Sequence, residues 1–294
     1  MLYAVTHRTT YGYASDVAVS HHLVHLRPRE LPWQQVTDFA LSVEPPAAAI
    51  AGERTDYHGN AASYFSIRHP HDRLVVTARS RVRVTRPALP ERTPPWQQVR
   101  DRCASNVLTP DSAVGEFRFD STYITRKPAF AEYAAASFPN DRPLLDGVID
   151  FTACIYRDFR FDSRATTVAT PVDEVFKMRR GVCQDFAHFA VAGLRSLGLP
   201  ARYVSGYLET LPPPGKARLV GADASHAWFA VWCPGHGWID ADPTNNILPG
   251  DRHITVAWGR DFGDVSPVRG VVVGGSGHRL GVSVDVARIT EPAA

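Results

Sequence analysis

Four prolines between residues 87 and 95 divide the chain into two parts with different hydrophobic patterns, and this division constrains the fold most strongly. Proline has no amide hydrogen to give to a strand or a helix interior, so such a cluster is typical of a connection between folded units. Before it, Ala62–Ile67 is rich in β-branched and aromatic residues, and Leu74–Val84 alternates partly, as a half-buried strand does. We therefore predict a β-sandwich-like N-terminal domain over residues 1–85.

After the prolines the pattern becomes helical. Residues 86–140 are mixed, and we expect a helical or irregular connection there, with one helix near Phe130–Ser137. From Leu144 to Tyr156 apolar residues recur at helical spacing, which predicts an amphipathic helix. A chain of 294 residues is long enough for two domains. We assign residues 141–294 to the second domain and the whole chain to the α+β class.

Another helix is predicted to begin at Cys183, directly after Gly181 has ended a short helix. Phe186 and Phe189 belong to the apolar face of this helix, and Gly198 is expected to terminate it. The segments expected after it are a strand over Ala201–Leu208, a loop through Pro212–Gly215, strands over Ser225–Trp232 and Trp238–Asp242, and a closing hairpin over Gly270–Val286.

Charge and cysteine content exclude several functional classes. The net charge of +2 is too small to indicate binding to nucleic acid or to an anionic membrane. The 4 cysteines are irregularly spaced, which is unlike a disulfide framework. The first residues lack the basic and apolar stretches of a signal peptide, and no run approaches the ~20 apolar residues that span a bilayer. We expect a soluble, cytoplasmic protein of bacterial type.

Cys183 is the first candidate for chemistry. A cysteine acts as a nucleophile in its thiolate form, which the N–H groups and the dipole of a helix N-terminus favour. The same N–H groups can hold the oxyanion of a tetrahedral intermediate. Asp185, in the same turn, opposes the thiolate electrostatically. The structural alternative is a buried core cysteine, which is the commonest role of this residue type.

His226 and Asp242 are the candidates that could activate such a thiol. Residues 234–237 read Pro-Gly-His-Gly, a hairpin turn that would bring the strand ending at Asp242 back beside the strand that carries His226. A carboxylate in that position would fix the imidazole tautomer and stabilise the imidazolium. Asp240 is a rival to Asp242 for this position. The structural alternatives are that His226 is a structural histidine and that Asp242 caps the end of its strand.

At this point the sequence resembles the transglutaminase-like superfamily of cysteine acyl-transfer enzymes. The core motifs that carry the resemblance are Gly181–Ala187, Ala201–Tyr207, Ser225–Trp228, Gly237–Trp238 and Asp242–Asn245, in the family's order. Further motifs resemble the accessory N-terminal domain and the tail of bacterial members: Tyr11, Pro28–Arg29, Asp56, Gly59–Asn60, Gly259–Val265 and Pro267–Gly270. The resemblance implies a papain-like core in which a helix bearing the cysteine packs on an antiparallel sheet. It also implies that Cys183 is the nucleophile, His226 the general base and acid, and Asp242 the orienting acid.

The implied reaction is acyl transfer on an amide or peptide bond through a thioester. We prefer hydrolysis, as in a peptidase or amidase, because no residue pattern indicates an amine-binding site. The alternatives are an amine-accepting transglutaminase and a non-catalytic binding module on the same fold. We expect a peptide or protein substrate and neither cofactor nor metal, and the sequence indicates no oligomeric state.

Two minor hypotheses concern residues around the triad. Gln184 and Tyr156 are guesses for a side-chain oxyanion donor. A zinc site could be drawn from Cys183, His188, Cys233 and His236, but the last two flank a tight turn and we do not favour it.

Overall fold

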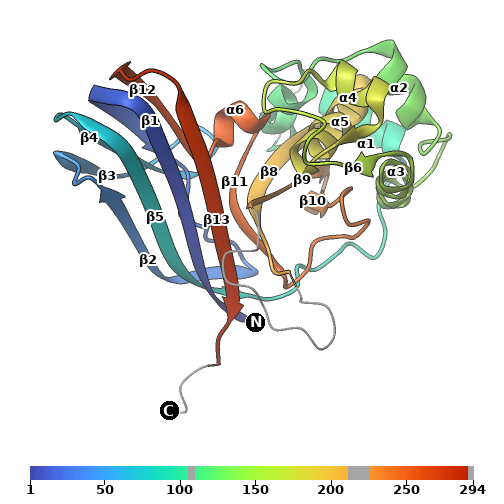
Figure 1. Cartoon of the computed structure of the whole chain (residues 1–294). Coiled ribbons are helices and arrows are strands. Elements are labelled where there is room, and N and C mark those ends of the chain that lie inside the picture. The colour runs from blue at the N-terminus through green and yellow to red at the C-terminus, as the bar shows by residue number, and fades with distance from the viewer. Residues whose placement is uncertain (105–109, 211–224, 291–294) are drawn as a thin grey trace, which may run out of the picture.

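The computed structural model describes residues 1–104, 110–210 and 225–290 of the chain. Its N-terminal part is a set of long antiparallel strands, and a mixed α/β core lies beside it (Figure 1). The α+β class is therefore confirmed. The Pro212–Gly215 loop lies outside the described residues.

The first strand, β1, organises the N-terminal part because its two halves have different neighbours. Residues 2–12 lie between β5 and β13, whereas residues 17–24 lie between β4 and β12. Apolar residues of β4 and β5, including Phe65 and Leu74, are fully buried in one cluster with residues of β2 packed against it. The strands of this part are β1 (Leu2–Val24), β2 (Gln34–Glu44), β3 (Ala49–Thr55), β4 (Ala61–Ile67), β5 (His71–Val84), β12 (Val268–Gly274) and β13 (His278–Arg288).

The last two strands correct one prediction. Both β12 and β13 run antiparallel to β1, one after the other along its length, so the predicted closing hairpin is wrong. Gly274, Gly275 and Gly277 have positive φ angles and bend the chain at the point where the register of β1 is interrupted. The predicted second domain, residues 141–294, includes β12 and β13, whereas these strands hydrogen-bond to β1. The domain boundaries themselves stay a prediction.

The core consists of helices packed on a sheet with the strand order β10-β9-β8-β11. Helix α5 lies on this sheet and buries Phe189 and Val191 against Phe229 and Val231. The predicted helix from residue 144 is present as α3, and the one near residue 130 as α2. The elements of the core are α1 (Trp96–Ala104), the 3₁₀ helix η1 (Pro110–Arg118), α2 (Pro128–Ala135), α3 (Leu144–Asp158), β6 (Arg160–Phe161), α4 (Val172–Met178), β7 (Arg180–Gly181), α5 (Cys183–Ser196), β8 (Ala201–Leu208), β9 (Ser225–Cys233), β10 (Gly237–Ala241), β11 (His253–Gly259) and α6 (Phe262–Val265).

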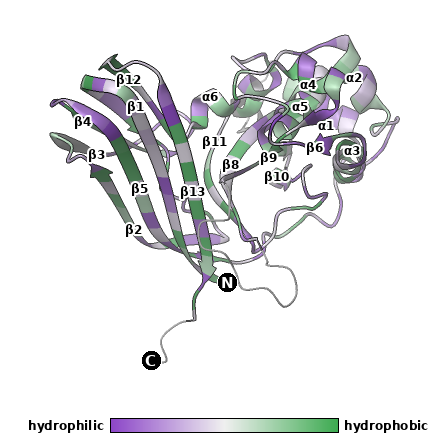
Figure 2. Cartoon of the chain, in the orientation of Figure 1, coloured by the Kyte–Doolittle hydropathy of each residue, from purple (hydrophilic) through white to green (hydrophobic). Residues whose placement is uncertain are grey.

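The N-terminal strands and the core share a hydrophobic cluster. Tyr3 of β1, Val82 of β5 and Val284 of β13 are buried together with Tyr203 of β8 and Ile254 of β11. Polar and apolar residues alternate along β13, as expected of a strand with one buried face (Figure 2). The cluster also reaches the N-terminus of α5, so the N-terminal part supports the candidate site. Within the described residues, no helix is long and apolar enough to cross a membrane.

Candidate active site

Helix α5 holds Cys183 in its first turn. The first hydrogen bond of the helix runs from the Phe186 N–H to the Val182 carbonyl at 3.1 Å, which leaves the N–H groups of Cys183 and Gln184 without an acceptor inside the helix. These N–H groups are placed to stabilise an oxyanion formed at the half-buried Cys183 side chain.

Asp185 is turned back over the start of the helix. Its Oδ2 atom accepts hydrogen bonds from the Val182 N–H at 2.8 Å and from the Thr166 hydroxyl at 2.6 Å. Burial raises the pKa of this carboxyl, although the two donors oppose that change. A β-carbon on Gly181 would collide with the Asp185 carboxyl, which explains why glycine precedes the helix. The carboxyl therefore caps the backbone at the start of the helix.

The hairpin of β9 and β10 brings His226 and Asp242 together. Cys233 pairs with Gly237, so the turn takes the three residues between them, and Asp242 follows directly after β10. The Nε2 atom of His226 lies 2.7 Å from Oδ2 of Asp242. Cys183 interacts electrostatically with the His226 side chain and helps to raise its pKa. Since Asp242 occupies Nε2, Nδ1 is the ring nitrogen that remains for the thiol.

The electrostatics of this group favour an ion pair. Burial lowers the pKa of His226, but interactions with Asp242 and Cys183 outweigh burial and raise it above the ordinary histidine value. Burial raises the pKa of Asp242, but its hydrogen bonds from His226 and His253 bring it well below the usual range. Asp242 is fully buried, and these two pKa shifts favour a carboxylate beside an imidazolium.

Two further residues contact the Asp242 carboxylate. His253 Nε2 lies 3.2 Å from Oδ2, and the Asn245 side-chain amide donates to the same oxygen at 2.7 Å. His253 is buried at the start of β11, which pairs with β8 and not with β10. Sequence reasoning missed His253, because this distant pairing leaves no local signal. Asn245 lay within a family motif but had been given no role.

Asp240, the rival carboxylate, has a different partner. It accepts a hydrogen bond from the indole N–H of Trp228 at 3.1 Å. Desolvation raises the pKa of its carboxyl. The contacts therefore favour Asp242 over Asp240 as the partner of His226.

The minor hypotheses gain no support from the contacts. The Gln184 amide donates to the Val168 carbonyl at 3.3 Å, and Tyr156 is 53% exposed on α3. His188 accepts a hydrogen bond from the Phe262 N–H at 3.1 Å, which occupies its Nε2 atom. The group with metal-binding geometry among the described residues is instead His226, Asp242 and His253, whose ligand atoms lie within 4.8 Å of one another.

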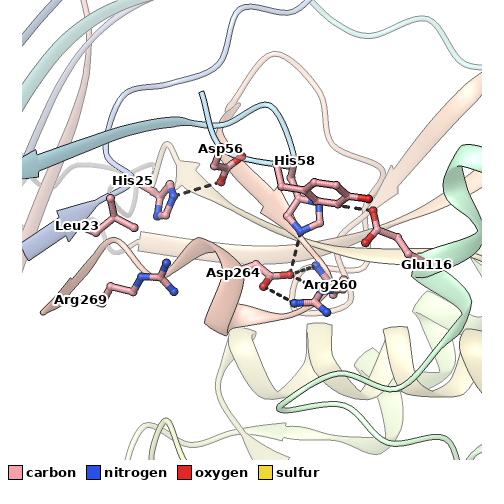
Figure 3. Close-up of a pocket in the computed structure, with 9 residues that line it drawn as sticks. Leu23, His25, Asp56, His58, Glu116, Arg260, Asp264 and Arg269 are labelled. Atoms are coloured by element: carbon pink, nitrogen blue, oxygen red, sulfur yellow. Dashed lines mark hydrogen bonds and ion pairs between the residues drawn. The ribbon is translucent and has the colours of Figure 1, made fainter. Parts of the chain in front are cut away.

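A charged cavity of about 350 Å³ lies where the N-terminal part meets α6 (Figure 3). His58 lies 3.1 Å from Asp264, whose carboxylate also accepts two hydrogen bonds from the Arg260 guanidinium at 2.9 and 3.0 Å. On the other side of the cavity, His25 lies 3.3 Å from Asp56. Because Arg260 and the two histidines each contact a carboxylate of the cavity, we interpret this cavity as a structural joint.

The family motifs of the N-terminal part form the same joint. The Asn60 amide donates to the Trp258 carbonyl at 2.8 Å and accepts from the Trp258 N–H at 2.9 Å. Asn60 is also bonded to Asp56, and its side-chain oxygen accepts from Arg29. These residues dock the turn at 56–60 onto β11, so a structural role accounts for Arg29, Asp56 and Asn60.

Comparison with known proteins identifies two family regions in the chain. Residues 3–83 match the bacterial transglutaminase-like N-terminal region, and residues 132–243 match the transglutaminase-like superfamily. An uncharacterized protein of Mycobacterium tuberculosis strain H37Rv is 42% identical over 97% of this chain and 92% of that protein. One of Mycobacterium leprae is 31% identical over 97% of this chain and 98% of that protein.

Two further relatives have more informative names. A protein-glutamine gamma-glutamyltransferase of Pseudomonas aeruginosa is 34% identical over 33% of this chain and 16% of that protein. The solved structure of a candidate cysteine protease from Cytophaga hutchinsonii has a TM-score of 0.72 and 20% identity, and covers 98% of both chains. Because the identity to the Cytophaga hutchinsonii protein is only 20%, this similarity concerns the fold alone.

Proposed function

Because the chain belongs to the bacterial transglutaminase-like superfamily, we propose that it is a cysteine-dependent enzyme that transfers the acyl group of an amide or peptide bond. The family and the fold support cysteine-based acyl transfer in general. The observation that supports the specific residues is the 2.7 Å contact between His226 and Asp242, together with the electrostatic interaction between Cys183 and His226.

The reaction would begin with attack of the Cys183 thiolate on the carbonyl carbon. Its oxyanion would accept hydrogen bonds from the first N–H groups of α5. As the carbon–nitrogen bond breaks, the His226 imidazolium would give its proton to the departing amine, which leaves a thioester on Cys183. Asp242 would hold the ring and stabilise its charge.

The thioester would then be hydrolysed. Neutral His226 would take a proton from water, the resulting hydroxide would attack the thioester carbon, and the carboxylic acid would leave as Cys183 returns to the thiolate. We prefer water to an amine as the acceptor, because neither the sequence nor the contacts that the described residues make around Cys183 indicate an amine-binding group. The proposed substrate is a peptide or protein, and a cytoplasmic location stays a prediction.

Mass spectrometry of a trapped acyl-enzyme tests the proposal. Incubation with p-nitrophenyl acetate should give an acetylated protein, and peptide mapping should locate a hydroxylamine-sensitive thioester on Cys183. Cys183→Ala should give no adduct, and His226→Ala should form it far more slowly. An adduct on another cysteine, or equal turnover by Cys183→Ala, would leave the non-catalytic binding module as the better reading.

The same assay separates hydrolysis from transfer. With a primary amine such as cadaverine present, a hydrolase should still release mainly acetate. Accumulation of the acetylated amine in its place would assign the chain to amine-accepting transglutaminases.

A further inference from the structure

A second cavity, of about 540 Å³, lies against the core sheet and is separate from the charged joint described above. It is bounded by the connection after β5 and by the sheet face that carries Arg202, Trp238 and Asp240. Arg202 is paired with Ala230, whereas α5 covers the neighbouring residues Phe229 and Val231, so this face points away from α5. The volume falls in the ~300–1,000 Å³ range of small-molecule sites.

Arg202 is the unusual feature of the cavity. Its side chain is 4% exposed, and its guanidinium carbon lies 4.3 Å from the ring centroid of Trp238 and 3.6 Å from that of Trp258. Its Nε atom is buried without a hydrogen-bond partner. Across the part of the chain that the structure describes, no hydrogen bond or ion pair reaches this guanidinium. A buried cation without a hydrogen-bonded partner is costly to a fold.

Arg195 shows how this fold treats a buried arginine that serves structure alone. It is 1% exposed, and its guanidinium donates to the Ala201 carbonyl at 3.0 Å, the Phe119 carbonyl at 2.9 Å and the Arg260 carbonyl at 2.7 Å. Arg195 thus has its hydrogen bonds supplied by the protein itself. Arg202, buried to a similar degree, has two aromatic rings and no acceptors.

The nearby acid does not complete the site. Asp240 lines the same cavity, but its carboxyl accepts from Trp228, and no ion pair joins it to Arg202 among the described residues. Burial lowers the pKa of Arg202, although a guanidinium stays protonated at neutral pH. Arg86, exposed at the cavity, adds a second positive charge. Asp240 therefore interacts with Arg202 electrostatically but leaves the guanidinium N–H groups without an acceptor.

The shape of the guanidinium decides which anion fits. Tryptophan rings pack against it, so its in-plane N–H groups remain for bonding. A carboxylate can accept two such N–H groups side by side. Much of the remaining lining is apolar, including Trp33 and Leu89. We propose that this cavity binds a carboxylate ligand with an apolar or aromatic body, and that its carboxylate pairs with Arg202.

This site is independent of the proposed acyl transfer, and its test measures binding. Trp33, Trp238 and Trp258 line the cavity, so their fluorescence should report occupancy. Phenylacetate should give saturable quenching, whereas the neutral isostere phenylacetamide should bind about tenfold or more weakly. N-acetylphenylalanine and its amide repeat the comparison for a peptide carboxylate. Tighter binding of N-acetylphenylalanine would indicate a peptide terminus, and tighter binding of phenylacetate a free acid.

Variants separate a binding role from a packing role. Arg202→Met keeps an apolar stem between the rings and should lose the preference for acid over amide. Leu89→Glu, at a 40% exposed position, should weaken binding of the acids by repulsion without disturbing the core. Arg81→Met, at an exposed position of β5, should bind as the wild type does.

Thermal unfolding gives a measurement that needs no ligand. Arg195→Met should lower Tm clearly, because it removes donors from several carbonyls. Arg202→Met should leave Tm unchanged or raise it, because it removes a buried charge that makes no hydrogen bond. A large fall in Tm for Arg202→Met, equal binding of acid and amide, or no saturable binding of either acid would each overturn the proposal.

Discussion

At the scale of single residues, Asp240 and Asp242 are chemically alike but contact different groups. Asp242 bonds to His226 at 2.7 Å, whereas Asp240 accepts from the indole of Trp228. Asp242→Asn should therefore lower kcat by about 10²–10⁴-fold while the fold persists, because the imidazolium loses its counter-charge. Asp240→Asn should reduce kcat much less. Steady-state kinetics with circular dichroism as the folding control makes the comparison, and a more damaging Asp240→Asn would mean that the wrong carboxylate has been assigned.

The same substitution has a predicted pH signature. The interactions with Asp242 and Cys183 raise the pKa of His226 against the opposing effect of burial. Activity that needs the imidazolium persists below this raised pKa and is lost as pH rises through it. In Asp242→Asn burial remains and one hydrogen bond to a charge is lost, so the alkaline limb of kcat/KM should move to lower pH. An unmoved limb would show that this limb reports another group.

His253 offers a second prediction at this scale, as a positioning residue that acts through Asp242. His253→Phe removes a donor at 3.2 Å from the carboxylate and should lower kcat/KM by about tenfold. His253→Gln can still donate an N–H and should retain most activity. If the two variants lose activity equally, packing at β11 rather than the hydrogen bond is what matters.

At the scale of elements, the start of α5 should make one thiol unlike the others. Cys103 and Cys233 are buried, and burial raises the pKa of Cys233. Cys154 is half-buried on α3, beside the Ser137 hydroxyl. Cys183 begins a helix and interacts electrostatically with His226, so at pH ~6 it should react fastest with iodoacetamide.

Peptide mapping across a pH series measures the four rates. In His226→Ala the labelling profile of Cys183 should move to higher pH, while the profiles of the other cysteines stay in place. Equal labelling of all four thiols at pH ~6 would remove Cys183 as the activated nucleophile.

The elements also show what sequence could predict and why. Helix α5 and strands β8 and β9 have strong local periodicity, and the turn at 234–236 has characteristic residues, so these were predicted closely. The described residues between 96 and 140 include short α-helices and a 3₁₀ helix, whose periodicity is too brief to detect. The Gly274–Gly277 segment has the composition of a hairpin turn, but pairing of both flanking strands with β1 overrides that local preference.

The candidate site shows the same limit. Cys183, His226 and Asp242 lie in family motifs or beside a local turn. In the structure His226 contacts Asp242 at 2.7 Å, and Cys183 interacts electrostatically with His226. His253 reaches Asp242 because β11 pairs with β8. Likewise, the Arg202 guanidinium packs against Trp238 and Trp258, which come from different strands. Contacts made across a sheet between distant segments have no signature in the sequence near either partner.

At the scale of the whole molecule, the shared hydrophobic cluster couples the N-terminal strands to the core. The joint at β11 adds hydrogen bonds between Asn60 and both backbone groups of Trp258. We therefore predict that the chain unfolds in a single cooperative transition, and that acyl-transfer activity disappears within it. Two separate transitions in differential scanning calorimetry would instead support independent domains close to the predicted boundaries.

Asn60 provides the sharpest test of this coupling. The residue is fully buried, and Asn60→Ala would leave the Trp258 N–H and carbonyl without their partner and deprive the Arg29 guanidinium of an acceptor. Each of the two Trp258 groups left unpaired costs about 1–3 kcal/mol, so the free energy of unfolding should fall by about 2–6 kcal/mol in total. Asn140→Ala, at an exposed position, is the matched control and should change stability by less than about 0.5 kcal/mol. Denaturant unfolding followed both by tryptophan fluorescence and by loss of activity should shift to lower denaturant by the same amount for Asn60→Ala. If fluorescence shifts and activity does not, the joint stabilises the N-terminal part alone and the site does not depend on it.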